Sequence, residues 1–283
     1  GIRDLVRSRG LVDVYKRQKH LPRLRELGID AVWLMPIHPI GETNRKGTLG
    51  SYYAVRDYCG VNPEFGTMAD FDRFVSTAHG LGLKVLLDWV ANRTARDARW
   101  IAEKPASWYE RDAAGEPAVP WDWSDTAKLN YADRDVWRAQ ADAMEFWLTQ
   151  HDVDGFRCDM AMLVPIEFWN ETSLRLRRVK PDLFMLAEAE ERNLFEEGAF
   201  DACYAWRMHH LMNDVAQQRT RVTALRDYMN EGNLARTFEC SEDDAAMIAT
   251  SDLLTLRKTI YAANLSENDV NQPEACKYFT QVQ

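Results

Sequence analysis

The sequence lacks the features that mark membrane-spanning, nucleic-acid-binding and disulfide-stapled proteins. No apolar run is long enough to cross a bilayer. Positive charge is in deficit, with 35 Lys and Arg against 44 Asp and Glu, and the net charge of -9 argues against a general affinity for nucleic acid or anionic membranes. The five cysteines form no CxxC pair, so we expect reduced or buried thiols rather than a metal site or a disulfide framework. What remains is an ordinary globular composition, 46% hydrophobic and 28% charged over 283 residues, with room for one large barrel domain or two small domains.

The first 18 residues do not share the pattern of the rest. Residues 11–18 (LVDVYKRQ) resemble a peptide that arises when a sequencing-library adapter is translated at the broken end of a metagenomic contig. We therefore expect residues 1–18 to be a non-native or disordered arm, with the native N-terminus missing. The alternative is an unremarkable basic arm. The lack of a signal peptide consequently says nothing about localisation.

From Lys19 onward, helix and strand patterns alternate. A leucine-rich helix stops near Gly28, and a strand is expected over residues 31–35. Thr67 is placed to cap a helix that ends at two glycines, and residues 84–88 form the next strand, which finishes in a carboxylate. Alternating units of this kind predict a parallel sheet.

The chain then makes a longer excursion over residues 92–130, rich in Pro, Gly, Trp and Asp, which we interpret as a loop insertion at one end of the sheet. A helix is expected over residues 135–150, and a further strand over residues 200–206. The segment 231–283 is atypical, and only residues 253–260 suggest another amphipathic helix.

Two strands in the middle of the chain each end abruptly in a carboxylate. They are 155–159 (GFRCD) and 184–188 (FMLAE), separated by a helix expected over residues 165–179. Side chains alternate along a strand, so Arg157 and Asp159 share one face, and a charge pair there is costly unless it is used or compensated. The pattern predicts a β/α barrel with acids at the same end of several strands.

Several motifs resemble the alpha-amylase family of glycoside hydrolases, in the same order and at similar separations over roughly residues 19–230. The three that carry most weight are 88–92 (DWVAN), 155–159 (GFRCD) and 187–189 (AEA). Three more look similar to that family: 31–36 (AVWLMP), 50–55 (GSYYAV) and 61–67 (VNPEFGT). The resemblance implies a (β/α)8 barrel catalytic domain over residues 19–230, with the 92–130 insertion after its third strand.

The resemblance also implies a retaining attack on an alpha-glucosidic bond. Asp159 matches the nucleophile and Glu188 the general acid/base, with Glu190 and Glu191 as alternatives for the acid. Three further residues match substrate-site positions: Arg157, which holds the nucleophile ionised, Asp88, which orients this group, and Tyr53, an aromatic platform under the sugar. Two carboxyls about 5 to 5.5 Å apart leave no room for an intervening water, so one attacks carbon while the other protonates the leaving oxygen.

Cofactor and substrate-site expectations centre on Asn92 and Arg93. No cofactor is required for the chemistry, but Asn92 matches a position that often binds structural calcium in the family. Arg93 stands where the family normally has a histidine that donates a hydrogen bond to the sugar. We place Arg93 among the substrate-binding residues, although arginine is longer and always charged.

A second departure is the family's third essential carboxylate, in an Asn-His-Asp run on the seventh strand. None of the six histidines belongs to such a run. The nearest candidates for the carboxylate, at residues 251–252 and 268–269, do not follow a segment with a strand pattern. We expect the barrel to be truncated at both ends, with its first, seventh and eighth strands missing or non-native.

Three functions stay open. The first is hydrolysis of starch-like alpha-glucans or maltooligosaccharides. This chain would then be a fragment of the hydrolase, and such a fragment need not be active by itself. The second is glucosyl transfer or isomerisation on the same barrel, and the third is carbohydrate binding without catalysis. Family analogy suggests extracytoplasmic or periplasmic action. The tryptophans of the insertion could stack on sugar rings or form the insertion's own small core: Trp100, Trp108, Trp121 and Trp123.

Overall fold

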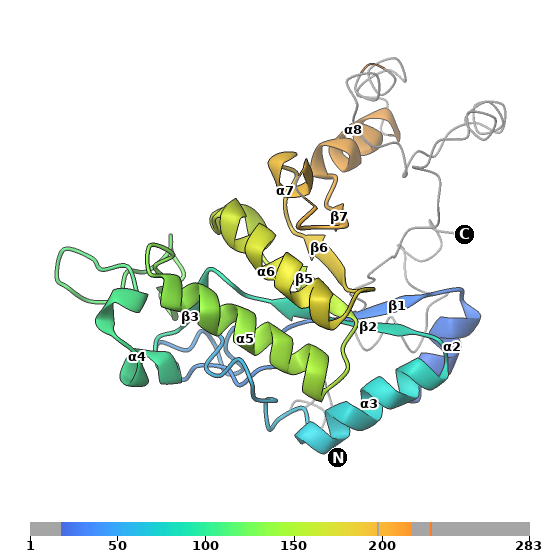
Figure 1. Cartoon of the computed structure of the whole chain (residues 1–283), viewed down its shortest axis with the longest axis horizontal. Coiled ribbons are helices and arrows are strands. Elements are labelled where there is room, and N and C mark those ends of the chain that lie inside the picture. The colour runs from blue at the N-terminus through green and yellow to red at the C-terminus, as the bar shows by residue number, and fades with distance from the viewer. Residues whose placement is uncertain (1–17, 197, 217–226, 228–283) are drawn as a thin grey trace.

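The computed structural model describes residues 18–196, 198–216 and 227. Its centre is a five-stranded sheet in the order β1-β2-β5-β6-β7, and every neighbouring pair is parallel (Figure 1). The strands span β1 Ala31–Leu34, β2 Lys84–Trp89, β5 Gly155–Cys158, β6 Phe184–Ala187 and β7 Ala202–Cys203. Strands that are neighbours in the sheet follow one another along the chain with helices between them, which is the order of a (β/α) barrel.

Helices cover one face of this sheet. They are α2 Leu21–Glu26, α3 Met68–Gly80, α5 Arg134–Gln150 and α6 Ile166–Val179, of which α3, α5 and α6 lie together on that face in Figure 1. Thr67 begins α3 through a capping box: its hydroxyl accepts from the Asp70 amide at 3.2 Å, while its own amide donates to the Asp70 carboxylate at 2.8 Å. Pro165 caps α6, which ends just before Pro181, as the sequence predicts.

The core lies between these helices and the sheet. β5 is buried along its whole length and β2 in all but its first residue, as is typical of central strands in a parallel sheet. Large aromatic side chains fill this space without exposure: Trp89, Trp147, Trp169, Phe71, Phe156 and Phe168. Close packing of this kind leaves little freedom for the strand ends that carry the polar residues.

The predicted excursion contains more regular structure than expected. β3 Arg93–Ala95 pairs antiparallel with β4 Thr126–Lys128, and α4 Arg99–Glu103 and the 3-10 turn η1 Ala106–Trp108 lie between them. A small second core joins the excursion to helix α5: four of its buried residues come from the excursion and one, Val136, from α5, and the cluster is Trp108, Tyr109, Ala127, Leu129 and Val136. Its boundaries at 92 and 130 remain a prediction.

The last described elements depart in part from the prediction. The strand expected over residues 200–206 is only the two-residue β7, and Trp206 already begins helix α8, Trp206–Ala216. The amide of Tyr204 still reaches the Ala187 carbonyl at 3.3 Å, after which the chain turns away. Two short elements complete the set: η2 Ala161–Leu163 and α7 Asn193–Glu196.

Several expectations lie outside the described residues. They concern the arm up to residue 17, the first, seventh and eighth strands, the segment 231–283 and the helix at 253–260. Within the part of the chain that the structure describes, the sheet begins at β1, ends at β7 and does not close on itself. This is the arrangement of an incomplete (β/α)8 barrel.

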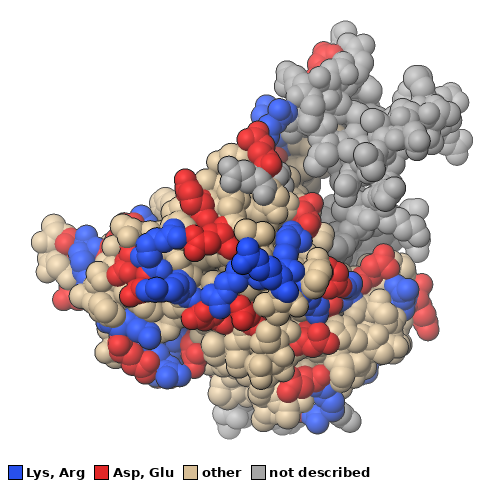
Figure 2. Space-filling model, viewed as in Figure 1, with Lys and Arg blue, Asp and Glu red and all other residues tan. Residues whose placement is uncertain are grey.

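The surface carries no strong field of one sign on the face shown in Figure 2, where acidic and basic side chains are interspersed. Among the described helices, none is both long and apolar enough to cross a membrane. Cys59 is exposed, Cys158 is buried and Cys203 is half-buried, and none of these three described cysteines forms a disulfide with another described residue.

Candidate active site

Three carboxylates lie at the same end of adjacent strands. Asp88 in β2 is directly opposite Arg157 in β5. Asp159 and Glu188 follow β5 and β6, and the sheet ladder continues through them: the Asp159 amide donates to a β2 carbonyl at 2.8 Å and the Glu188 amide to a β5 carbonyl at 3.0 Å. Because parallel strands end at one edge of the sheet, the three acids converge there.

The guanidinium of Arg157 joins all three acids. Its Nη1 donates to both oxygens of Asp88, at 2.9 and 3.0 Å, and to Oδ1 of Asp159 at 3.2 Å. Its Nη2 lies 2.6 Å from Oε1 of Glu188. The Arg157 side chain is only 4% exposed, so these ion pairs are little screened by water. The structure thus brings the four residues together as the sequence predicts.

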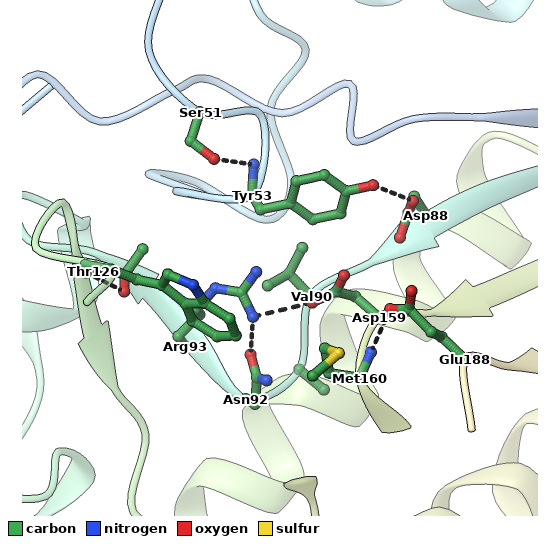
Figure 3. A network of polar contacts seen from close by, with 12 residues as sticks. Ser51, Tyr53, Asp88, Val90, Asn92, Arg93, Thr126, Asp159, Met160 and Glu188 are labelled. Carbon is green, nitrogen blue, oxygen red and sulfur yellow. Dashed lines mark hydrogen bonds and ion pairs between the residues drawn. The ribbon is translucent and has the colours of Figure 1, made fainter. Parts of the chain in front are cut away.

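Asp88 is fully buried and has two further donors. Trp33 Nε1 donates to its Oδ2 at 3.2 Å, and the Tyr53 hydroxyl donates to the same oxygen at 3.1 Å (Figure 3). Burial raises the pKa of Asp88 to about 7, although the positive charge of Arg157 opposes that rise. With these partners, Asp88 fixes both the guanidinium and the Tyr53 ring.

Glu188 sits in a different environment from Asp159. Its Oε2 accepts from the Met160 amide at 2.9 Å (Figure 3), and Met160 itself adopts a left-handed backbone conformation with φ 45°. Burial raises the pKa of Glu188, and the Asp159 carboxylate adds to the rise, while the Met160 amide and Arg157 act against it. A raised pKa is what a general acid requires.

The alternative acids lie elsewhere. Glu190 accepts from the Arg207 amide at 2.8 Å, and Glu191 accepts from the amide of Glu190 at 3.0 Å. Neither lines the cavity that contains Asp159 and Glu188. Geometry therefore favours Glu188.

Arg93 occupies the other side of Asp159. Its Nη1 donates to Oδ2 of Asp159 at 2.9 Å and to Oδ1 of Asn92 at 2.6 Å (Figure 3). Its guanidinium lies 4.1 Å from the centre of the Trp123 ring, and the residue is 5% exposed. Both oxygens of Asp159 are consequently paired with a guanidinium.

These contacts do not fit a calcium ion at Asn92. Calcium needs several oxygen ligands, and the side-chain oxygen of Asn92 already accepts from a cationic group. Among the described residues, no group of three His, Cys, Asp or Glu side chains is arranged to hold a metal. The sequence-based expectation of calcium at Asn92 stays untested, and the local geometry does not support it.

The converging residues line a cavity of about 360 Å³. Tyr53 lines this cavity, as predicted, and its hydroxyl donates to the buried Asp88. The complete lining is Lys46, Ser51, Tyr53, Arg93, Trp123, Asp125, Thr126, Arg157, Asp159, Met160 and Glu188. The candidates for a third carboxylate, at residues 251–252 and 268–269, lie outside the described residues.

Sequence reasoning missed three residues that position the site: Trp33, Met160 and Tyr204. The Tyr204 hydroxyl accepts from Nε of Arg157 at 3.0 Å. Alternation along the strand at 31–35 could have placed Trp33 on the same face as the acids, and Tyr204 lies within the strand expected over residues 200–206. Nothing in the sequence signals the left-handed conformation of Met160.

Comparison with known proteins agrees with this geometry. Residues 17–124 match the family model described as the alpha amylase catalytic domain. An alpha-1,4-glucan:maltose-1-phosphate maltosyltransferase from Salinibacter ruber is 36% identical over 199 residues, which cover 62% of this chain and 30% of the relative. The alpha-amylase MalA from Haloarcula japonica is 37% identical over 158 residues, covering 53% of this chain and 23% of the relative. The chain thus spans less than a third of the length of these curated relatives.

Solved structures point the same way. The crystal structure of an alpha-amylase from Lactobacillus plantarum superposes with a TM-score of 0.71 at 39% identity, covering 78% of this chain and 55% of that one. The maltogenic alpha-amylase AmyB from Thermotoga neapolitana gives a TM-score of 0.70 at 36% identity, over 76% of this chain and 50% of that one. Together with the family match and the converging acids, these likenesses identify the chain as a member of the alpha-amylase family of enzymes.

Proposed function

We propose that this chain carries the catalytic centre of a retaining enzyme that acts on alpha-glucosidic bonds in starch-like glucans or maltooligosaccharides. The observation that carries the proposal is the single guanidinium, Arg157, in contact with Asp88, Asp159 and Glu188 at one cavity. Asp159 is the nucleophile and Glu188 the general acid/base.

In the first step, an Asp159 oxygen attacks the anomeric carbon while the bond from that carbon to the glycosidic oxygen breaks. The bonding electrons pass to the leaving oxygen, which takes the proton of Glu188. The raised pKa of Glu188 favours its protonated form, and both oxygens of Asp159 accept from guanidinium groups.

In the second step, an acceptor oxygen attacks the same carbon and the ester bond to Asp159 breaks. Glu188, now a carboxylate, takes the proton from the acceptor. Two inversions at one carbon retain the configuration. Asp88 and Arg157 stay in place throughout both steps and hold the carboxyl groups of Asp159 and Glu188 in position relative to each other.

The acceptor decides between hydrolysis and transfer. Water gives hydrolysis, and a sugar hydroxyl gives glucosyl or maltosyl transfer. A transferase is a second candidate because several similar relatives, among them the Salinibacter ruber protein, are maltosyltransferases by name. We favour hydrolysis because the similar solved structures at 36% to 39% identity are alpha-amylases.

The test is release of reducing ends from soluble starch and maltooligosaccharides by the purified chain and by its Asp159→Asn variant. We expect activity in the first and its loss in the second, because an amide cannot form the ester. A chain that binds maltooligosaccharides without turnover, equally well with Asp159→Asn, would instead support a non-catalytic binding function. Product analysis with maltose separates the two acceptors: glucose alone indicates hydrolysis, and longer oligosaccharides indicate transfer.

A further inference from the structure

The four tryptophans of the excursion fall into two pairs with different surroundings. Trp100 and Trp108 are in edge-to-face contact with ring centres 5.2 Å apart, and they pack with the small second core. Trp121 and Trp123 lie apart from that core, with ring centres 4.7 Å apart at an interplanar angle of 52°. Trp121 is 63% exposed, more than any other large apolar side chain among the described residues.

A row of contacts leads from the nucleophile to this exposed ring. Asp159 pairs with Arg93 at 2.9 Å, the Arg93 guanidinium lies 4.1 Å from the Trp123 ring centre, and Trp123 contacts Trp121. Exposure rises along the row: Asp159 and Arg93 are buried, Trp123 is half-buried at the cavity wall, and Trp121 is open to solvent. The row therefore runs from the cavity to the surface.

The turn that carries Trp121 is anchored on both sides. Lys46 Nζ donates to the Asp122 carbonyl at 3.1 Å, and Asn44 Nδ2 donates to the Ser124 carbonyl at 3.1 Å. The Trp123 amide donates to the Pro120 carbonyl at 3.1 Å. The segment between β1 and α3 thus holds the turn against the mouth of the cavity, so the ring needs little ordering when a ligand arrives.

Trp121 is also strained. Its φ is 50°, a left-handed conformation that residues with bulky side chains rarely adopt. An exposed indole in such a backbone gains nothing from burial in the protein itself. Both the strain and the exposure are accounted for when the ring has a ligand.

We propose that Trp121 forms an additional subsite for a glucosyl unit of an extended alpha-glucan chain, outward from the cavity that holds Asp159. This subsite rests on the proposed function, because the chain must enter that cavity. The apolar face of a pyranose ring packs on an aromatic ring, and the ring's hydroxyls stay in water. Trp123 is not this platform, because Arg93 already covers its ring.

The test is binding of maltose and maltoheptaose, measured by calorimetry on the full chain and on a Trp121→Asn variant, both carrying Asp159→Asn so that the ligand is not cleaved. Asparagine tolerates the left-handed backbone, so the substitution removes the ring without adding strain. We expect maltoheptaose to bind about tenfold more weakly to the variant, with maltose affinity unchanged. Val119→Ala is the matched control, because Val119 is an exposed apolar side chain of the same segment at 41% exposure.

Equal maltoheptaose affinity in the chain and in Trp121→Asn would overturn the subsite while leaving the proposed function intact. Loss of both ligands in the variant would mean a general defect of the cavity, and would also overturn it. Failure of the chain with Trp121 intact to bind either sugar would instead contradict the proposed function. Thermal unfolding of each variant checks that all of them are folded.

Discussion

Asp159 is held from two directions. Arg157 Nη1 reaches one of its oxygens at 3.2 Å and Arg93 Nη1 reaches the other at 2.9 Å. These two charge-assisted hydrogen bonds engage lone pairs of both oxygens, which lowers the reactivity of the carboxylate toward carbon. Arg157 has further partners in Asp88 and Glu188, whereas the charge of Arg93 is directed at Asp159 alone among the ion pairs of the described residues.

We predict that Arg93→His raises kcat/KM on maltooligosaccharides about tenfold, which corresponds to about 1.4 kcal/mol. Histidine is shorter and mostly neutral near pH 7, so it frees one oxygen of Asp159 for attack. The control is Arg96→His, because Arg96 donates to the backbone carbonyls of Pro117 and Thr126 instead. A fall in kcat/KM with Arg93→His would contradict this prediction and would show that Arg93 binds substrate, as expected from the sequence.

His38 is a second residue whose surroundings in the folded protein disfavour its charged form. It is 1% exposed and surrounded by aromatic rings, its Nδ1 lies 3.2 Å from the Gly60 carbonyl, and its Nε2 has no partner among the described residues. Burial lowers the pKa of His38 to about 4, while the Gly60 carbonyl and the charge of Asp57 oppose that shift. The folded protein therefore keeps His38 neutral at pH values where the unfolded chain binds a proton.

We predict that stability falls by about 3 kcal/mol through His38 as the pH drops from about 6.5 to about 4. The sign follows from linkage: the pKa of His38 is lower in the folded protein than in the unfolded chain, so the unfolded chain binds the proton first as the pH falls. The loss of stability is therefore absent well above pH 6.5 and grows as the pH falls toward about 4. Urea unfolding of the chain and of His38→Phe over this range measures it. The stability of the chain should fall by that amount relative to His38→Phe, and parallel pH curves would contradict the prediction.

Short motifs predicted the charged residues of this site and missed the residues that hold them in position. Asp88, Arg157, Asp159 and Glu188 could be found because each ends or follows a strand, and parallel strands bring such positions together. Trp33 lies far away in sequence: strand alternation can place it on the face of the acids, but no local pattern signals its hydrogen bond to Asp88 across the sheet. The pairing of Arg93 with Asp159 depends on the path of the excursion, which spacing alone does not determine.

Among the elements, β5 and β6 bear most directly on the site because they carry Asp159 and Glu188. Their close approach depends on Gly155: a Cβ there would lie 1.9 Å from the carbonyl oxygen of Phe184 in β6. That oxygen belongs to the backbone and cannot rotate away. The first residue of β5 therefore sets the spacing of the two strands.

We predict that Gly155→Ala lowers the free energy of unfolding by about 1 to 3 kcal/mol and reduces activity, because β5 must shift against β6. Gly80→Ala is a matched control in helix α3, where nothing lies within 4 Å of the added Cβ. The control should be neutral or stabilising by up to about 1 kcal/mol. Urea unfolding measures both, and equal effects would contradict the role given to Gly155.

Periodicity predicted the long elements well and the short ones less well. Helices α3, α5 and α6 begin and end close to the predicted residues because caps and prolines mark their ends. β3 and β4 were missed because three-residue strands are too short for a period to show. β7 is shorter than predicted since Trp206 starts a helix there.

At the scale of the whole molecule, the sheet of the described residues does not close, and β1 and β7 stand at its two ends. An open sheet presents backbone donors, acceptors and apolar surface that a closed barrel covers. We predict that the purified chain associates or aggregates and unfolds over a broad thermal transition. A monomeric elution profile together with a sharp, reversible transition would count against this.

The most direct test of the account compares alpha-glucosyl fluoride with maltooligosaccharides as substrates for the chain, Asp159→Asn and Glu188→Gln. Fluoride leaves without a proton, whereas a sugar oxygen needs one. We therefore predict that Glu188→Gln releases fluoride in a burst of about one equivalent per active site, as the Asp159 ester forms, but does not cleave the oligosaccharide, and that Asp159→Asn does neither. Glu188→Gln that loses both substrates equally, or Asp159→Asn that keeps either one, would contradict the roles assigned to these two carboxyls.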